Sequence, residues 1–103
     1  MKKLSIGIDL DKTVCTARYE SGGIMSCKVL PGAKEVIDLL REQGHRVTLY
    51  TERSSDRREM TVRWLNRHAI IYDDIIFDKP EFDWYIGDEA EKFRTWRHIR
   101  IRV

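Results

Sequence analysis

The sequence contains no apolar run of the roughly 20 residues that a membrane-spanning helix needs. Its basic start, MKK, is followed by a charged residue too soon for a secretory signal peptide. Only two cysteines occur, Cys15 and Cys27, which excludes a disulfide-rich scaffold and favours two reduced structural thiols. We therefore expect a cytoplasmic protein with no membrane partner.

The chain also lacks internal repeats, linkers, low-complexity segments and a strong excess of either charge. Its 103 residues are 42% hydrophobic and 10% aromatic, which suits one packed core and excludes a disordered chain. We predict a single domain over residues 1–103. The net charge of +2 gives no strong field for nucleic acid. Arginines gather in residues 53–67 and 94–102, where they form either solvated faces or a basic rim that attracts phosphorylated substrates.

Short apolar segments alternate with helical patterns along the chain. Five segments are predicted to be strands: residues 3–9, 45–51, 74–77, 83–88 and 98–103. A helix is predicted over residues 31–44, with Pro31 in its first turn and Gly44 just past its end. Residues 14–29 read as two short strands around a turn, forming a hairpin or flap.

A second helix is predicted towards His68, with Ser54, Ser55 or Asp56 as its cap. Strands that alternate with helices imply crossover connections and a mainly parallel sheet. The sequence therefore predicts a three-layer α/β domain.

Chemically active side chains follow each of the first four predicted strands. Asp9 and Asp11 follow the first strand, Thr51 the second, Lys79 the third and Asp88 the fourth. Open α/β sheets bind their ligands at this carboxyl edge. Three converging carboxylates would repel one another unless a cation intervened, and a hard cation such as Mg²⁺ prefers oxygen ligands.

The same positions suit phosphoryl transfer. Thr51 and Lys79 supply a neutral and a positive donor for the charge of a transferring phosphoryl group. One aspartate is able to attack phosphorus, and its neighbour two residues away is placed to give a proton to the leaving group.

Four segments resemble, in order, the motifs of the haloacid dehalogenase superfamily. They are IGIDLDKTV, VTLYT, FDKP and DWYIGDE, and together they span nearly the whole chain. This resemblance implies a Rossmann-like fold and a magnesium-dependent phosphatase that forms an aspartyl-phosphate intermediate.

The resemblance also implies a role for each matching residue. Asp9 corresponds to the nucleophile and a magnesium ligand. Asp11 corresponds to the general acid and base, and its backbone carbonyl is a further magnesium ligand. Thr51 and Lys79 correspond to the residues that hold the phosphate, and Asp88 to the metal-binding acid.

Two departures from the family pattern concern neighbouring residues. Many members have glycine where this chain has Lys12, and the second acid of the fourth motif is replaced by Glu89, which we assign to an auxiliary metal contact. Arg53 either reaches substrate or faces solvent. The residues assigned to substrate binding are Lys12, Thr13, Thr51, Glu52, Arg53 and Lys79.

The chain leaves little room for a cap domain, so we expect an open site shielded by the flap or by a neighbouring subunit, which leaves a homo-oligomer open. The last motif looks most like small capless phosphatases of the capsular polysaccharide biosynthesis type, which implies a phosphorylated small molecule or saccharide as substrate. The alternatives are a polynucleotide 3′-phosphatase, a protein phosphatase, and a non-catalytic module that binds phosphate or metal. Nucleic acid is thus a less favoured partner.

Overall fold

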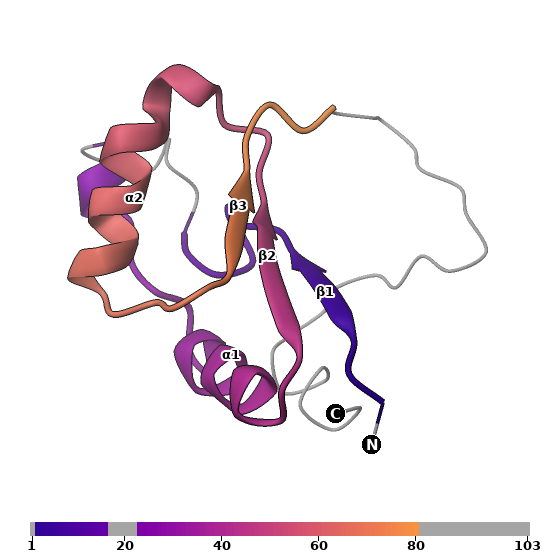
Figure 1. Cartoon of the computed structure of the whole chain (residues 1–103). Coiled ribbons are helices and arrows are strands. Elements are labelled where there is room, and N and C mark those ends of the chain that lie inside the picture. Colours follow the sequence, from indigo (N-terminus) through magenta and orange to yellow (C-terminus); the bar gives the residue numbers. More distant parts are fainter. Residues whose placement is uncertain (1, 17–22, 81–103) are drawn as a thin grey trace.

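The computed structural model describes residues 2–16 and 23–80. Three parallel strands form the sheet in the order β1 (Ser5–Ile8), β2 (Arg46–Tyr50) and β3 (Asp74–Ile76) (Figure 1). In the register, Ser5 lies opposite Arg46, and Thr48 lies opposite Asp74. The predicted parallel α/β arrangement is therefore confirmed for the first three strands.

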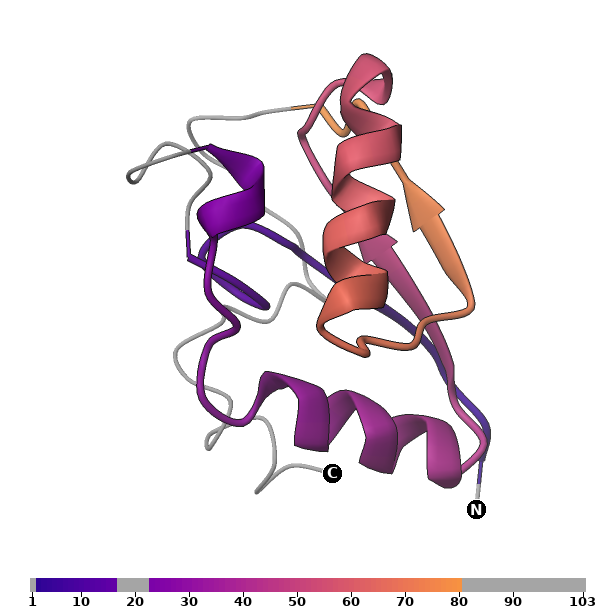
Figure 2. The same cartoon turned by 90° about the vertical axis from the view of Figure 1, so that its left-hand side faces the viewer.

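Two helices, α1 (Ala33–Glu42) and α2 (Arg58–Arg67), lie on the same face of this sheet (Figures 1 and 2). This placement follows from two successive right-handed crossovers that step in the same direction. The predicted third layer is not tested, because the strands predicted at residues 83–88 and 98–103 lie outside the described residues. Within the described ranges, no helix has the length and apolar character needed to cross a membrane.

The core lies between the sheet and the two helices. Val47 and Leu49 alternate with less buried residues along β2, as a strand with one face on the core requires. The indole Nε1 of Trp64 donates a 2.9 Å hydrogen bond to the Cys27 carbonyl oxygen, which ties α2 to the loop before α1. The other core residues include Ile8, Leu10, Val36, Ile37, Leu40 and Leu65.

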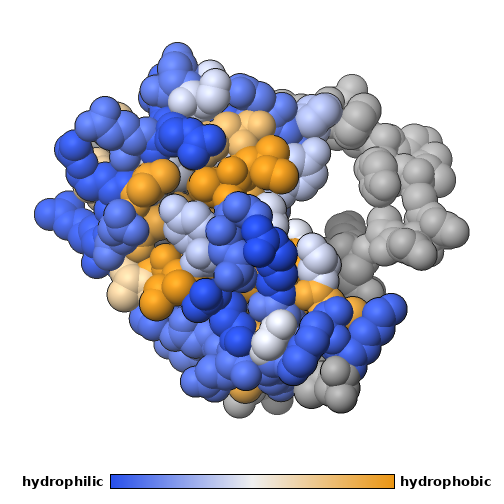
Figure 3. Space-filling view, viewed as in Figure 1, coloured by the Kyte–Doolittle hydropathy of each residue, from blue (hydrophilic) through white to orange (hydrophobic). Residues whose placement is uncertain are grey.

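The surface visible in Figure 3 is largely hydrophilic, with smaller apolar areas between the charged side chains. Among residues 2–16 and 23–80, the large apolar residues that remain exposed are Leu4, Tyr50, Met60, Ile71 and Ile76.

The end of α1 matches the sequence prediction. Gly44 has φ +88°, a left-handed conformation that glycine adopts without a steric penalty. The amide of Gly44 donates to the Arg41 carbonyl and that of His45 to the Leu40 carbonyl, which together close the helix in a Schellman motif. The helix begins at Ala33, two residues later than the Pro31 start predicted from the sequence.

The predicted hairpin over residues 14–29 is wrong at residues 24–26, where its second strand was expected to begin. Ile24–Ser26 form a 3-10 turn, η1, because Ile24 is buried in the core and Ser26 Oγ donates to the Gly23 carbonyl. The antiparallel pairing expected of a hairpin is present between Cys15 and Val29, where the Thr16 amide donates to the Lys28 carbonyl and the Leu30 amide to the Val14 carbonyl. Residues 17–22 of the predicted hairpin lie outside the described residues.

The predicted cap of α2 is also wrong. A 3-10 turn, η2 (Ser55–Arg57), precedes the helix, and neither η2 nor α2 has a side-chain hydrogen bond from its N-cap residue. Asp78, which follows β3, instead accepts a 3.2 Å hydrogen bond from the amide of Ser55. The acceptor comes from a residue distant in sequence, so local pattern alone does not reveal it.

Candidate active site

The segments that follow β2 and β3 are joined by backbone hydrogen bonds. The Thr51 amide donates to the Ile76 carbonyl, and the Lys79 amide donates to the Thr51 carbonyl. The Asp78 amide donates to the Arg53 carbonyl in the same way. The segments after β2 and β3 are therefore held side by side, which brings Thr51 and Lys79 to one edge.

The loop after β1 is a compact turn centred on one carbonyl. The amides of Thr13, Val14 and Cys15 all donate to the Leu10 carbonyl oxygen. The Leu10 side chain is buried, which anchors the turn in the core. Lys12 is exposed and has φ 64°, at the position where glycine would ease the turn. Both aspartates of the motif therefore lie beyond the end of β1, in a loop held by the core.

Asp9 lies at this edge with its side chain 43% exposed. Its Oδ1 accepts a 2.8 Å hydrogen bond from the amide of Leu10, which fixes one carboxylate oxygen. Its Oδ2 lies 4.0 Å from Lys79 Nζ, and that ammonium group also lies 5.1 Å from the centre of the Tyr50 ring. Two residues predicted to be catalytic, Asp9 and Lys79, are thus adjacent.

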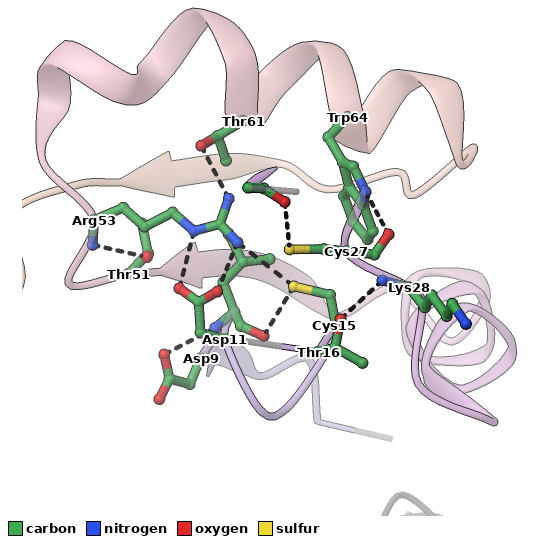
Figure 4. Close-up of polar contacts among 12 residues, drawn as sticks. Asp9, Asp11, Cys15, Thr16, Cys27, Lys28, Thr51, Arg53, Thr61 and Trp64 are labelled. Carbon is green, nitrogen blue, oxygen red and sulfur yellow. Dashed lines mark hydrogen bonds and ion pairs between the residues drawn. The ribbon is translucent and has the colours of Figure 1, made fainter. Parts of the chain in front are cut away.

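Asp11 is bound very differently, as part of a two-pronged ion pair with Arg53 (Figure 4). Arg53 Nε donates to Oδ2 at 2.9 Å, and Arg53 Nη2 donates to Oδ1 at 2.6 Å. The Arg53 side chain is 1% exposed and that of Asp11 is 19% exposed. Parallel, charge-assisted hydrogen bonds of this kind fix both the position and the rotation of the carboxylate.

The rest of the guanidinium group is held from other elements. Nη1 donates a 3.1 Å hydrogen bond to Oγ1 of Thr61 in α2, and Nη2 contacts Cys15 Sγ at 3.6 Å. The Arg53 amide donates to Thr51 Oγ1 at 3.0 Å. Burial acts to lower the pKa of Arg53, but the hydrogen bonds and negative charge of Asp11 outweigh it, so the pKa lies above its ordinary value.

Both cysteines are free and buried, as expected for two structural thiols. Burial raises the pKa of the Cys15 thiol to about 12, and the neighbouring Arg53 offsets only part of that effect. Cys15 is therefore a neutral thiol near neutral pH and serves as a packing partner of the guanidinium group.

The structure corrects the expected placement of Arg53. We expected this side chain to reach substrate or to face solvent, but it turns into the protein towards Asp11 and Thr61. The sequence showed that Arg53 lies two residues after Thr51, and therefore close to the carboxyl edge of the sheet. Its inward direction depends on partners 42 residues before and 8 residues after it.

The remaining predicted substrate residues differ in exposure. Thr51 and Thr13 are buried, whereas Lys12 and Glu52 are exposed on the loops after β1 and β2. These positions put Lys12 and Glu52 within reach of solvent, while Thr51 has its hydroxyl oxygen bonded to the Arg53 amide. The substrate-binding roles stay predictions.

The magnesium site is only partly represented in the described residues. Asp88 and Glu89 lie outside them, and residues 2–16 and 23–80 contain no group of three His, Cys, Asp or Glu side chains able to hold a metal. Asp9 fits a magnesium ligand, since Mg²⁺ is commonly held by one or two carboxylates together with waters and substrate phosphate. The side chain of Asp11 is engaged by Arg53, which is compatible with a contribution from its backbone carbonyl.

No protein-family model matches the chain, and a comparison with curated proteins finds no match either. Solved structures do match. A structural-genomics target from Vibrio cholerae is 20% identical with a TM-score of 0.68, covering 88% of this chain and 84% of that one. A conserved protein from Bacteroides thetaiotaomicron is 24% identical with a TM-score of 0.67, covering 95% and 87%.

A chain of the Pnkp1/Rnl/Hen1 complex is also similar in structure. It is 24% identical with a TM-score of 0.65, and the match covers 82% of this chain but 30% of that one. A second structure, of the Pnkp1/Rnl/Hen1 RNA repair complex, gives 19% identity and a TM-score of 0.65. At these identities the likeness shows a shared α/β fold.

Proposed function

We propose that this chain is a magnesium-dependent phosphomonoester hydrolase of the haloacid dehalogenase type, with Asp9 as the nucleophile. The observation that carries the proposal is the placement of Asp9. Its carboxylate is half-exposed at the carboxyl edge, one oxygen is fixed by the Leu10 amide, and the other faces Lys79. A carboxylate that is accessible, oriented and next to a cation suits attack on a phosphate.

In the first step, a carboxylate oxygen of Asp9 forms a bond to phosphorus and the phosphorus–oxygen bond to the leaving group breaks. Asp11, which must enter this step protonated on one oxygen, gives that proton to the leaving oxygen, so that an alcohol departs, a phosphoryl group remains on Asp9 and Asp11 becomes the carboxylate paired with Arg53. Lys79 stabilises the negative charge of the transferring group, aided by Thr51.

In the second step, a water oxygen bonds to phosphorus while the bond to Asp9 breaks. Asp11 takes the proton from that water, which restores the acid for the next cycle, and inorganic phosphate leaves. Asp9, the Asp11 carbonyl, Asp88 and Glu89 would hold the magnesium, which would supply positive charge to neutralise the phosphate oxygens.

The substrate we favour is a sugar phosphate or another phosphomonoester that is accessible to an open edge. Lys12 and Glu52 are exposed on the loops around that edge, where they are available to the non-reacting part of a substrate. The described residues include no cap domain over the edge, so the shape of the site does not restrict it to small substrates.

A polynucleotide 3′-phosphatase is the second candidate. It is favoured by the fold shared with chains of an RNA repair complex and by the exposed cations Lys12 and Arg57 in the loops after β1 and β2. Binding through such cations releases counterions from the phosphate backbone, so this candidate requires an affinity that falls steeply with salt.

The test is hydrolysis of p-nitrophenyl phosphate with and without magnesium by the wild type, Asp9→Asn and Asp11→Asn. We expect activity that requires magnesium and a loss of about 10³-fold or more in Asp9→Asn, because no nucleophile remains. Circular dichroism serves as a control for folding. Equal inertness of the folded wild type and of Asp9→Asn would favour the non-catalytic module instead.

Two further measurements identify the nucleophile and the substrate. A beryllium fluoride adduct located on Asp9 would identify the atom that accepts the phosphoryl group. A screen of sugar phosphates, phosphopeptides and 3′-phosphorylated oligonucleotides at two salt concentrations separates the candidate substrates.

A further inference from the structure

We propose that Arg53 is a positioning residue that holds the carboxylate of Asp11 in the orientation needed for proton transfer. This inference rests on the proposed function, since it assigns a task to Asp11 in that reaction. It replaces the substrate contact that the sequence suggested for Arg53.

The geometry of the pair supports this role. Both carboxylate oxygens of Asp11 accept hydrogen bonds from one planar guanidinium group, at 2.9 and 2.6 Å. A single contact would leave the carboxylate free to rotate, whereas two parallel contacts define its plane. Asp11 lies in a loop beyond β1 and not in a strand or helix, so its orientation depends on such contacts.

The guanidinium group is itself fixed by groups from separate parts of the fold. Thr61 in α2 accepts from Nη1, and the thiol of Cys15 contacts Nη2 (Figure 4). The backbone of Arg53 is bonded to Thr51, the residue assigned to the phosphate. A chain of hydrogen bonds thus runs from α2 through Arg53 to the acid, and it is buried apart from the outer side of Asp11. A residue that is itself held by fixed partners positions a catalytic group more accurately than a mobile residue does.

The experiment compares two leaving groups. Protonation by Asp11 matters greatly for an alkoxide leaving group and much less for p-nitrophenolate, which is a weak base. We therefore expect Arg53→Lys to lower kcat about tenfold to a hundredfold for glycerol 2-phosphate, with a much smaller loss for p-nitrophenyl phosphate. KM for both substrates should change less than about twofold, because Arg53 does not contact substrate. Thr61→Val should show the same selectivity with a smaller loss.

Two control variants and one double variant sharpen this experiment. Arg58→Gln removes an arginine that lies over the Phe77 ring, 4.7 Å from its centre, and Val36→Ala destabilises the core at a buried residue of α1. Neither should change the ratio of the two activities. In the Asp11→Asn background, Arg53→Lys should have almost no further effect on kcat, since it acts through Asp11.

The outcomes separate the two proposals. If the wild type hydrolyses neither substrate, the proposed function fails and the inference fails with it. If the wild type is active but Arg53→Lys lowers both activities equally, or changes them as Val36→Ala does, the function stands and the positioning role is overturned. A faster Arg53→Lys enzyme would mean that the ion pair restrains Asp11 in an unproductive position, which also overturns the inference.

Discussion

The two edges of the sheet both carry Arg–Asp ion pairs, but they use them differently. At the amino edge, Arg46 pairs with Asp74 at the starts of β2 and β3, and these side chains are 59% and 53% exposed. At the carboxyl edge, Arg53 pairs with Asp11, and the exposures are 1% and 19%. The same two residue types therefore form a solvated pair at one edge and a buried pair at the other.

The difference shows what each edge requires. An exposed pair adds little to stability, and its side chains are free to change rotamer in water. A buried pair costs desolvation and is retained only when its partners are well fixed, which also keeps both groups in one orientation. The proposed reaction requires a fixed orientation at the carboxyl edge, where Asp9, Thr51 and Lys79 lie, and it assigns no task to the amino edge.

The largest stability effect should come from breaking the buried pair. Asp11→Ala leaves the buried guanidinium group of Arg53 without its counter-charge, which we expect to lower the free energy of unfolding by about 3–5 kcal/mol. Urea denaturation followed by circular dichroism measures this loss. A loss below about 1 kcal/mol would mean that water replaces the carboxylate, and the contrast between the edges would disappear.

An intermediate effect is expected at Asp73, which precedes β3 at the amino edge. Its Oδ2 accepts a 2.8 Å hydrogen bond from the Val47 amide and its Oδ1 lies 3.2 Å from Arg41 Nη2. The Val47 amide, followed by Arg41, lowers the pKa of Asp73 below its ordinary value of 3.8.

Because the pKa is lower in the folded state, the ionised carboxylate of Asp73 stabilises the fold above pH 3.8, and this contribution is lost as pH falls through the lowered value. Asp73→Asn should therefore reduce the melting temperature at about pH 7, by less than Asp11→Ala does, and the difference from the wild type should shrink in acid. Thermal melts of the wild type and of Asp73→Asn, from about pH 7 down to below pH 3.8, provide the measurement. A difference that grows as pH falls would contradict the assigned direction.

Much of the fold followed from local pattern. The apolar residues Val47, Leu49 and Tyr50 identified the strand β2, and Gly44 marked the end of α1 because a left-handed residue is needed there. The rule that parallel strands present their carboxyl ends at one edge was enough to bring Asp9 and Lys79 together. These features depend on short stretches of sequence, so the sequence alone predicts them.

The features that were missed depend on distant partners. Arg53 turns inward because its guanidinium group forms hydrogen bonds with Asp11 and Thr61. No local sequence pattern distinguishes Arg53 from a surface arginine. Ile24 leaves the predicted hairpin because burial against the core outweighs its strand propensity. Tertiary contacts decided each of these cases.

The smallest effect should come from the exposed pair, and salt then sharpens the contrast between the edges. Asp74→Ala removes the partner of Arg46, and we expect a loss of about 0.2–1 kcal/mol, typical of an exposed pair. That loss should fall towards zero in about 1 M NaCl, where the Debye length is about 3 Å. The loss in Asp11→Ala should persist in the same salt, because mobile ions do not reach a buried guanidinium group. Urea titrations of the wild type and both variants at low and high salt make the comparison. If the two losses decrease in parallel, the Arg53 pair behaves as a solvated pair, and the distinction between the edges lies in position alone.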